Sequence, residues 1–198
     1  IIKALENMPD VIDIKAAGTA MRFMSAYLSV TPGSHIITGT ERMKHRPIGV
    51  LVDALRFLGA DIEYMGEEGF PPLKITGGKH DGGHLEISGG ISSQYISALL
   101  MIGPVLVKGR ELKLTGDIIS RPYIDLTLWM MKEFGADADW SDIDTITVKP
   151  QPYTSRDYYI ESDWSACKVI RLPDIYSVCW VSKPYSKVRN KVFLPLLN

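Results

Sequence analysis

Three consecutive polar residues, Ser92, Ser93 and Gln94, stand at the start of a predicted helix and could hold an anion. They follow Gly89-Gly90, which ends a short alternating run that is typical of a half-buried strand. The residues after them, to position 101, are apolar nearly all round, which favours a buried helix. The first N–H groups of a helix have no partner within it, and its dipole is positive at that end. This stretch therefore predicts a binding site for phosphate or carboxylate.

Other residues with similar chemistry recur along the chain. A turn at Gly18-Thr19 precedes another predicted helix, a polar loop rich in cations ends at Arg46, and a second loop ends at Ser120-Arg121. Taken alone, such arginines are most often solvated surface charges, Ser92-Ser93 are most often plain helix caps, and Tyr123 would be a core residue. The case for a binding site therefore depends on which elements bring these residues together.

The elements that position these residues form a repeat. In each copy a strand, a glycine-containing turn and a helix are followed by a strand, a loop with arginine and proline, a second helix ended by glycine, and two strands. In the first copy the expected elements are strand 11–14, helix 20–30, strand 35–38, a helix from Pro47 that stops at Gly59, and strands 61–64 and 73–76. In the second copy they are strand 85–88, helix 93–103, strand 111–115, helix 123–134 with Gly135 as its stop, and strands near 138 and at 145–148.

The predicted fold class is therefore α/β, with a unit of β-α-β-α-β-β and a period near 75 residues, which is the spacing of Arg46 and Arg121. We expect two full units at about 10–80 and 84–150, and a third that begins near Tyr158. One unit cannot close a core alone, so several must pack their helices together with their sheets outward. The loops at Gly18, Ser93, Arg46 and Ser120-Arg121 are then expected to share one rim.

Composition narrows the function classes. The 198 residues are 45% hydrophobic with a net charge of −1, which argues against nucleic acid or an anionic membrane as the partner. No transmembrane segment or signal peptide is expected, and the start at Ile1 without Met suggests a fragment. Cys167 and Cys179 do not have the spacing of metal ligands, and His80 and His84 flank a sequence that is unsuited to a helix, so no metal site is expected. The few cysteines are typical of a protein from a reducing cytoplasm. The glycines form no nucleotide-binding motif.

Four separate motifs, in the same order, resemble the 3-phosphoshikimate 1-carboxyvinyltransferase (EPSP synthase) family. The stretches that carry the resemblance are Ala17–Arg22, Glu41–Ile48 with Leu51–Arg56, Ser92–Met101, and Ser120–Asp125. The resemblance covers about residues 10–166, and we expect residues 1–166 to form part of one EPSP synthase-like lobe. Residues 167–198 show no resemblance to the family and are expected to come from a shifted reading frame or another artefactual end.

The resemblance implies an inside-out α/β barrel fold, with two lobes of three such units and substrates bound between them. It implies transfer of the enolpyruvyl group of phosphoenolpyruvate to the 5-hydroxyl of shikimate 3-phosphate, by addition and elimination, with no metal and no cofactor. The expected partners are these two small molecules, not nucleic acid or a membrane. The full-length form is expected to be a cytoplasmic monomer.

The resemblance also implies residue roles. Arg46, Gly18 and Gln94 would bind phosphoenolpyruvate, with Arg22 and Thr19 in support. Shikimate 3-phosphate would be held by Ser92, Ser93, Gln94, Ser120 and Tyr123. Both ligands are phosphorylated carboxylates, which suits arginine, hydroxyl groups and helix N-termini.

The sequence departs from the family pattern in ways that matter. Ala16 stands where the family commonly has Asn, and Arg121 replaces a frequent Lys. The family's N-terminal Lys-Ser…Arg motif and second lobe, with the expected acid and base residues, are absent, so no catalytic residue is assigned and the chain alone is expected to be inactive. Two alternatives stay open: a relative of UDP-N-acetylglucosamine enolpyruvyl transferase, and a non-catalytic module that binds a phosphorylated ligand.

Overall fold

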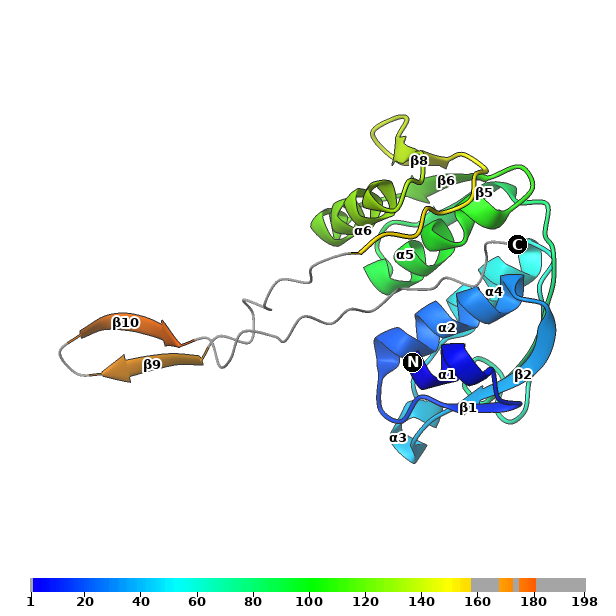
Figure 1. Cartoon of the computed structure of the whole chain (residues 1–198), viewed down its shortest axis with the longest axis horizontal. Coiled ribbons are helices and arrows are strands. Elements are labelled where there is room, and N and C mark those ends of the chain that lie inside the picture. The colour runs from blue at the N-terminus through cyan, green and yellow to red at the C-terminus, as the bar shows by residue number, and fades with distance from the viewer. Residues whose placement is uncertain (1, 158–167, 173–174, 181–198) are drawn as a thin grey trace. The chain divides into compact units, whose positions relative to one another are not determined.

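A computed structural model describes residues 2–157, 168–172 and 175–180 of the chain (Figure 1). Residues 2–154 belong to one compact unit, which we call the main body, and the candidate site lies within it. The second, smaller unit contains a hairpin of two antiparallel strands, β9 (Lys168–Leu172) and β10 (Ile175–Trp180). Within the described residues, no helix has both the length and the apolar character needed to cross a membrane.

The first repeat follows a short helix, α1 (Ile2–Asn7), which the sequence did not predict. It contains, in order, β1 (Val11–Asp13), α2 (Gly18–Val30), β2 (Gly33–Thr38), α3 (Glu41–Lys44), α4 (Gly49–Phe57), β3 (Asp61–Tyr64) and β4 (Leu73–Gly77). Its sheet has the order β1-β2-β4-β3, with β1 and β2 parallel and the other pairs antiparallel.

The second repeat has the same plan. It contains β5 (Gly83–Ser88), α5 (Ser93–Met101), a 3-10 turn η1 (Gly103–Val105), β6 (Arg110–Thr115), α6 (Arg121–Glu133), β7 (Ala138–Trp140) and β8 (Thr145–Val148). The strand order is β5-β6-β8-β7, with β5 and β6 parallel and the others antiparallel. The two repeats therefore share the order of elements expected from the sequence and also an identical sheet topology.

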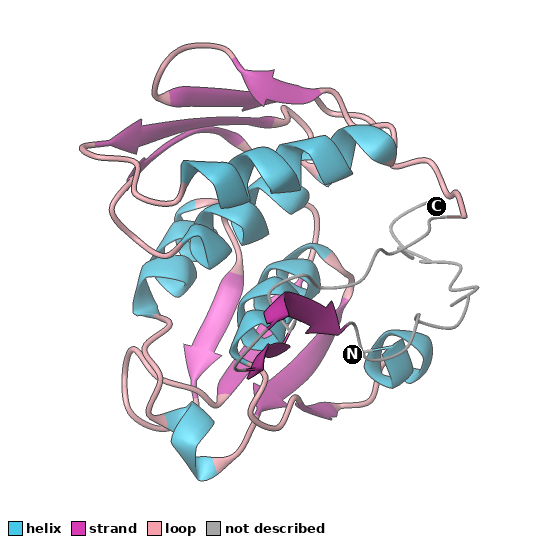
Figure 2. Cartoon of the chain, turned by 90° about the vertical axis from the view of Figure 1, so that its left-hand side faces the viewer, coloured by secondary structure: helices cyan, strands magenta, loops and turns pink. Residues whose placement is uncertain are grey.

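The helices of both repeats pack together between the two sheets (Figure 2). Helix α5 contacts α2, α4 and α6, and its Ile96, Leu99 and Leu100 are fully buried. Each such side chain contributes about 2 kcal/mol through removal of apolar surface from water. In β6, Leu112 faces this core while the neighbouring Glu111 is exposed, so the sheet presents its polar face outward, as expected.

Both second helices end in the same hydrogen-bonded motif. After α4, the Gly59 N–H donates to Arg56 O and the Ala60 N–H to Leu55 O, and after α6 the same pattern links Gly135 to Lys132 and Ala136 to Met131. The two glycines have φ values of +97° and +84°, which disfavour any residue with a side chain. The paired bonds define a Schellman motif, and the predicted glycine stops are confirmed.

Alanine at either stop should destabilise the main body, and the effect should be larger at Gly135. An alanine in the left-handed region costs about 1–2 kcal/mol. At Gly135 its Cβ would also lie 2.8 Å from Thr154 Oγ1, whereas at Gly59 the nearest atom, His80 Nδ1, is 3.4 Å away. Urea unfolding measures the difference, with Gly66→Ala as the control because Gly66 has neither a positive φ nor a close neighbour. Equal losses at Gly59 and Gly135 would contradict the steric argument.

The helix starts differ between the repeats, contrary to the predicted equivalence of Arg46-Pro47 and Arg121-Pro122. Helix α6 begins at Arg121 and includes Pro122 in its first turn, whereas α4 begins only at Gly49. In the first repeat the Ile48 N–H donates to Gly69 O at 2.9 Å, which binds the chain after Pro47 to the β3–β4 connection and delays the helix. The prediction that Pro47 is the first helical residue is therefore wrong. Part of the predicted polar loop also forms the short helix α3.

The expected third unit near Tyr158 and the boundary at residue 166 lie outside the described residues. They stay predictions.

Candidate anion-binding site

Two helix N-termini from different repeats meet in the main body. Gln94, in the first turn of α5, donates from Nε2 to Thr19 Oγ1 in the first turn of α2, at 3.0 Å. The N-cap of α5 is Ser92, whose Oγ accepts the Gln94 N–H at 3.4 Å, while the N-cap of α2, Ala17, offers no side-chain acceptor. The first turn of α2 therefore keeps N–H groups available for an external anion.

Gly18 allows an arginine from another loop to approach the start of α2. A Cβ on this glycine would overlap Arg46 Nη1 and lie 2.9 Å from Arg46 Cζ. The Arg46 side chain is exposed and has no hydrogen bond or ion pair with any residue that the structure describes. A guanidinium without a protein partner beside a helix N-terminus is suited to bind a carboxylate or phosphate.

Arg22 is buried one turn inside α2, with only 5% of its surface exposed. Its Nη1 donates to Gly18 O at 2.9 Å and its Nη2 to Pro47 O at 3.1 Å. Its guanidinium also lies 5.5 Å from the centre of the Tyr95 ring. Arg22 thus contacts both the Gly18 turn and the loop that carries Arg46, so it can support the site without facing a ligand.

Tyr95 makes a contact with the Arg46 loop that was not predicted from the sequence, where this residue is one of the apolar side chains of the helix. Its hydroxyl donates to Pro47 O at 2.8 Å, which links the second repeat to the Arg46 loop of the first. The sequence signal was weak: a tyrosine in the first turn of an otherwise apolar helix has a polar end that requires a partner.

The loops before α5 and α6 lie against each other. The Ile119 N–H donates to Gly89 O at 3.4 Å, and a Cβ on Gly89 would lie 3.0 Å from Ile118 Cγ1. This contact brings Ser120, the residue before α6, toward the turn that leads into Ser92 and Ser93. Ser120 makes no side-chain capping bond, and Ser92 is exposed, so their hydroxyls can serve a ligand.

Tyr123, in the first turn of α6, is 66% exposed, which excludes the core position that its residue type alone would suggest. Its exposed ring is available to a ligand at this end of α6. Ala16, also exposed, offers only a methyl group at the place where the family commonly has an amide.

Arg121 does not join the rim, contrary to expectation. Its guanidinium lies 3.9 Å from the Trp140 ring centre, and its Nη1 donates to Ile143 O at 3.0 Å. Trp140 in turn donates from Nε1 to Asp125 Oδ1 at 2.7 Å. Because α6 already starts at Arg121, this side chain is directed to the β7–β8 hairpin, where it binds protein groups.

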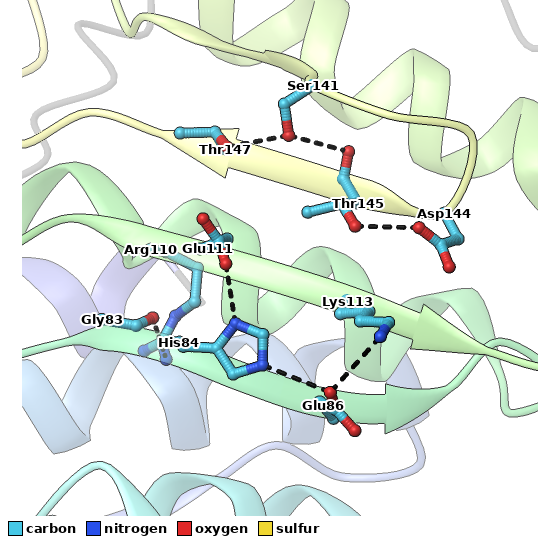
Figure 3. Close-up of polar contacts among 10 residues, drawn as sticks. All are labelled: Gly83, His84, Glu86, Arg110, Glu111, Lys113, Ser141, Asp144, Thr145 and Thr147. Atoms are coloured by element: carbon cyan, nitrogen blue, oxygen red, sulfur yellow. Dashed lines mark hydrogen bonds and ion pairs between the residues drawn. The ribbon is translucent and has the colours of Figure 1, made fainter.

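The two histidines that stand four residues apart, His80 and His84, have separate protein partners. His80 Nε2 lies 2.7 Å from Ser29 O, whereas His84 Nδ1 lies 2.7 Å from Glu111 Oε1 on the outer face of the second sheet (Figure 3). The hydrogen bond to Glu111 raises the pKa of His84, and the contact with Glu86 acts in the same direction. The two rings therefore contact different protein groups and do not share a site.

Sequence comparisons with known proteins show which family this chain resembles. The family model for EPSP synthase (3-phosphoshikimate 1-carboxyvinyltransferase) matches residues 2–170. A 3-phosphoshikimate 1-carboxyvinyltransferase of Bacteroides fragilis (strain YCH46) is 62% identical over 166 residues, which is 84% of this chain and 40% of the relative. One from Pectobacterium atrosepticum is 45% identical over 152 residues, covering 76% of this chain and 35% of the relative.

The fold comparison agrees. The structure of EPSP synthase from Acinetobacter baumannii matches with a TM-score of 0.63 and 26% identity, covering 73% of this chain and 31% of that one. The predicted inside-out α/β fold class is confirmed by this likeness. The chain spans about two fifths of the length of the Bacteroides relative that it matches. This chain belongs to the EPSP synthase (3-phosphoshikimate 1-carboxyvinyltransferase) family.

Proposed function

We propose that this chain supplies part of the substrate site of an enolpyruvyl transferase. In the proposed reaction the 5-hydroxyl of shikimate 3-phosphate adds to C2 of phosphoenolpyruvate while C3 gains a proton. The tetrahedral adduct then loses phosphate and a proton from C3, which gives 5-enolpyruvylshikimate 3-phosphate. The meeting of the α2 and α5 N-termini beside the Arg46 guanidinium, which has no partner among the described residues, is the observation that supports this role most directly.

The two ligands would occupy neighbouring places. Phosphoenolpyruvate would lie against both the Arg46 guanidinium and the start of α2 at Gly18, because both favour a small anion. The phosphate of shikimate 3-phosphate would accept hydrogen bonds from Ser92, Ser93 and Ser120. Gln94 would contact both ligands, since it already reaches from α5 to Thr19. The exposed Tyr123 would lie against the shikimate ring.

These residues bind and orient, and they include no carboxylate or imidazole for proton transfer. We therefore expect the chain alone to bind ligand without turnover, with no metal and no cofactor required. A cytoplasmic location and a monomeric full-length enzyme are part of the same proposal. The alternative is a relative of UDP-N-acetylglucosamine enolpyruvyl transferase. The residues Ser92-Ser93-Gln94 favour shikimate 3-phosphate over a UDP-sugar as the substrate.

Calorimetry with shikimate 3-phosphate on the 198-residue chain tests the proposal. Saturable binding is expected, and Ser93→Ala should weaken it about 10-fold or more, because a hydrogen bond to a charged group contributes about 1.5–3 kcal/mol. Ser141→Ala is the control, since its hydroxyl contacts Thr145 and Thr147 on the β7–β8 hairpin. Absence of binding by the unmodified chain, or equal affinity in Ser93→Ala, would contradict it.

A further inference from the structure

The carbonyl of Pro47 is held by donors from two helices. Arg22 Nη2 of α2 donates to it at 3.1 Å, and the Tyr95 hydroxyl of α5 donates to it at 2.8 Å. The two donors also lie together, because Arg22 Nη2 is 3.5 Å from the Tyr95 oxygen. One backbone oxygen thus joins the first repeat, the second repeat and the loop that carries Arg46.

The placement of Arg46 depends on this backbone. Its own guanidinium has no hydrogen-bonding or ionic partner within the described part of the chain, so no side-chain contact of this kind fixes it. The loop around it is held by the Arg46 N–H donating to Met43 O at 3.0 Å, by the Ile48 N–H donating to Gly69 O at 2.9 Å, and by the two bonds to Pro47 O. Among these contacts, the Tyr95 bond is the one that reaches the second repeat.

We infer that Tyr95 is a positioning residue, whose hydroxyl holds the Pro47 carbonyl so that Arg46 stays beside Gly18. This inference rests on the proposed function, since it assigns Arg46 to phosphoenolpyruvate. Tyr95 acts through the backbone of the loop and needs no contact with the ligand. The residue before it, Gln94, is proposed to contact both ligands, so the first turn of α5 would act on phosphoenolpyruvate directly through Gln94 and indirectly through Tyr95 and Pro47.

Tyr95→Phe isolates the hydroxyl, because the ring that packs near Arg22 is kept. Arg22 is a poorer choice for the test, since it also holds Gly18 O and its loss would disturb the start of α2 itself. Tyr153→Phe is the matched control: the Tyr153 hydroxyl donates to Met101 O at 2.9 Å elsewhere in the main body. The control removes the same type of bond at nearly the same length.

Hydrogen exchange of the backbone amides of Arg46 and Ile48, on the chain without ligand, tests the positioning directly. In Tyr95→Phe, loss of one hydrogen bond should increase the exchange rates of the Arg46 and Ile48 amides by roughly three- to tenfold. In Tyr153→Phe the two rates should stay unchanged. With ligands, Tyr95→Phe should weaken phosphoenolpyruvate binding by roughly three- to tenfold and change the affinity for shikimate 3-phosphate by less than twofold. A purely structural role would weaken both ligands alike.

The two readouts separate this inference from the proposed function. Unchanged exchange at Arg46 and Ile48 in Tyr95→Phe overturns the inference, whatever the ligands do. Faster exchange with unchanged phosphoenolpyruvate affinity overturns it as well. If the unmodified chain binds neither ligand, the proposed function fails, while faster exchange in Tyr95→Phe still supports the positioning of the loop.

Discussion

Arg46→Ala is expected to weaken phosphoenolpyruvate binding by about 100-fold or more. A guanidinium that meets a carboxylate or phosphate through two parallel N–H groups contributes about 3 kcal/mol, which corresponds to this factor. The guanidinium has no partner among the described residues, so its removal should cost the fold little. Calorimetric titration with phosphoenolpyruvate, together with an unfolding curve, separates the loss of affinity from a loss of stability.

Two further variants test whether the loss of affinity is specific to Arg46. Arg42→Ala removes an exposed cation from the neighbouring helix α3 and should leave the affinity nearly unchanged. Gly18→Ala keeps every charge but places a Cβ against the Arg46 guanidinium, so it should give an intermediate loss. If Arg42→Ala weakened binding as much as Arg46→Ala, the effect would be one of net charge, and the specific role of Arg46 would be refuted.

Arg110→Met is expected to stabilise the main body by about 1–3 kcal/mol at neutral pH. Arg110 is only 1% exposed, and its Nε and Nη2 have no hydrogen-bond partner within the described part of the chain. Its Nη1 makes one long contact, 3.5 Å from Gly83 O (Figure 3). Methionine can fill a similar space without a charge, so the desolvation cost disappears while the packing is largely kept.

The pH dependence of the Arg110 effect has a defined sign. Burial lowers the pKa of Arg110 from its usual range to about 10, so the folded state binds this proton less tightly than the unfolded state. The cost of burying the charge is therefore present in full below about pH 10 and declines as the pH rises from about 10 toward the usual range of the arginine pKa. The stability difference between Arg110→Met and the unmodified chain should be constant from pH 6 to 9 and shrink above about pH 10.

Urea unfolding of both proteins at pH 7.5 and pH 10.5 measures this difference. Comparison within the pair cancels the titration of lysines and tyrosines that the two proteins share. Arg110→Ala serves as the packing control, because it removes the charge but leaves a cavity and should gain less than Arg110→Met. A clear destabilisation by Arg110→Met at both pH values would show that the charge is satisfied in the fold and would contradict the argument.

The repeat was readable from the sequence because its strongest signals are local. A glycine at Gly59 or Gly135 permits a backbone conformation that other residues avoid, so the helix stops could be placed correctly. Helix starts carry weaker signals. Arg46-Pro47 and Arg121-Pro122 are identical in letters, but the Ile48–Gly69 hydrogen bond delays one helix, and no pattern near Pro47 reports that distant bond.

The same contrast between local signals and distant contacts applies to the candidate site. The start of α5 and the turn at Gly18 could be found from residue types, since helix N-termini and glycine turns have recognisable sequences. The direction of Arg121 toward Trp140 depends on a hairpin almost twenty residues away, so it could not be read from the loop. Arg110 was missed for another reason: the predicted strand began at Glu111, although period-two alternation with Leu112 would have placed Arg110 on the inner face.

Amide chemical shifts during titration with shikimate 3-phosphate test most directly whether the meeting of the two helix N-termini is the binding site. The account predicts that the largest changes occur at Ser93, Gln94, Tyr95 and Thr19, with smaller ones near Ser120. The alternative is a hollow in the second repeat lined by Lys108, Lys149 and His84, although both lysines already form ion pairs, with Asp81 and Asp137. Changes confined to that hollow, or no saturable change at the α2 and α5 N-termini, would contradict the account.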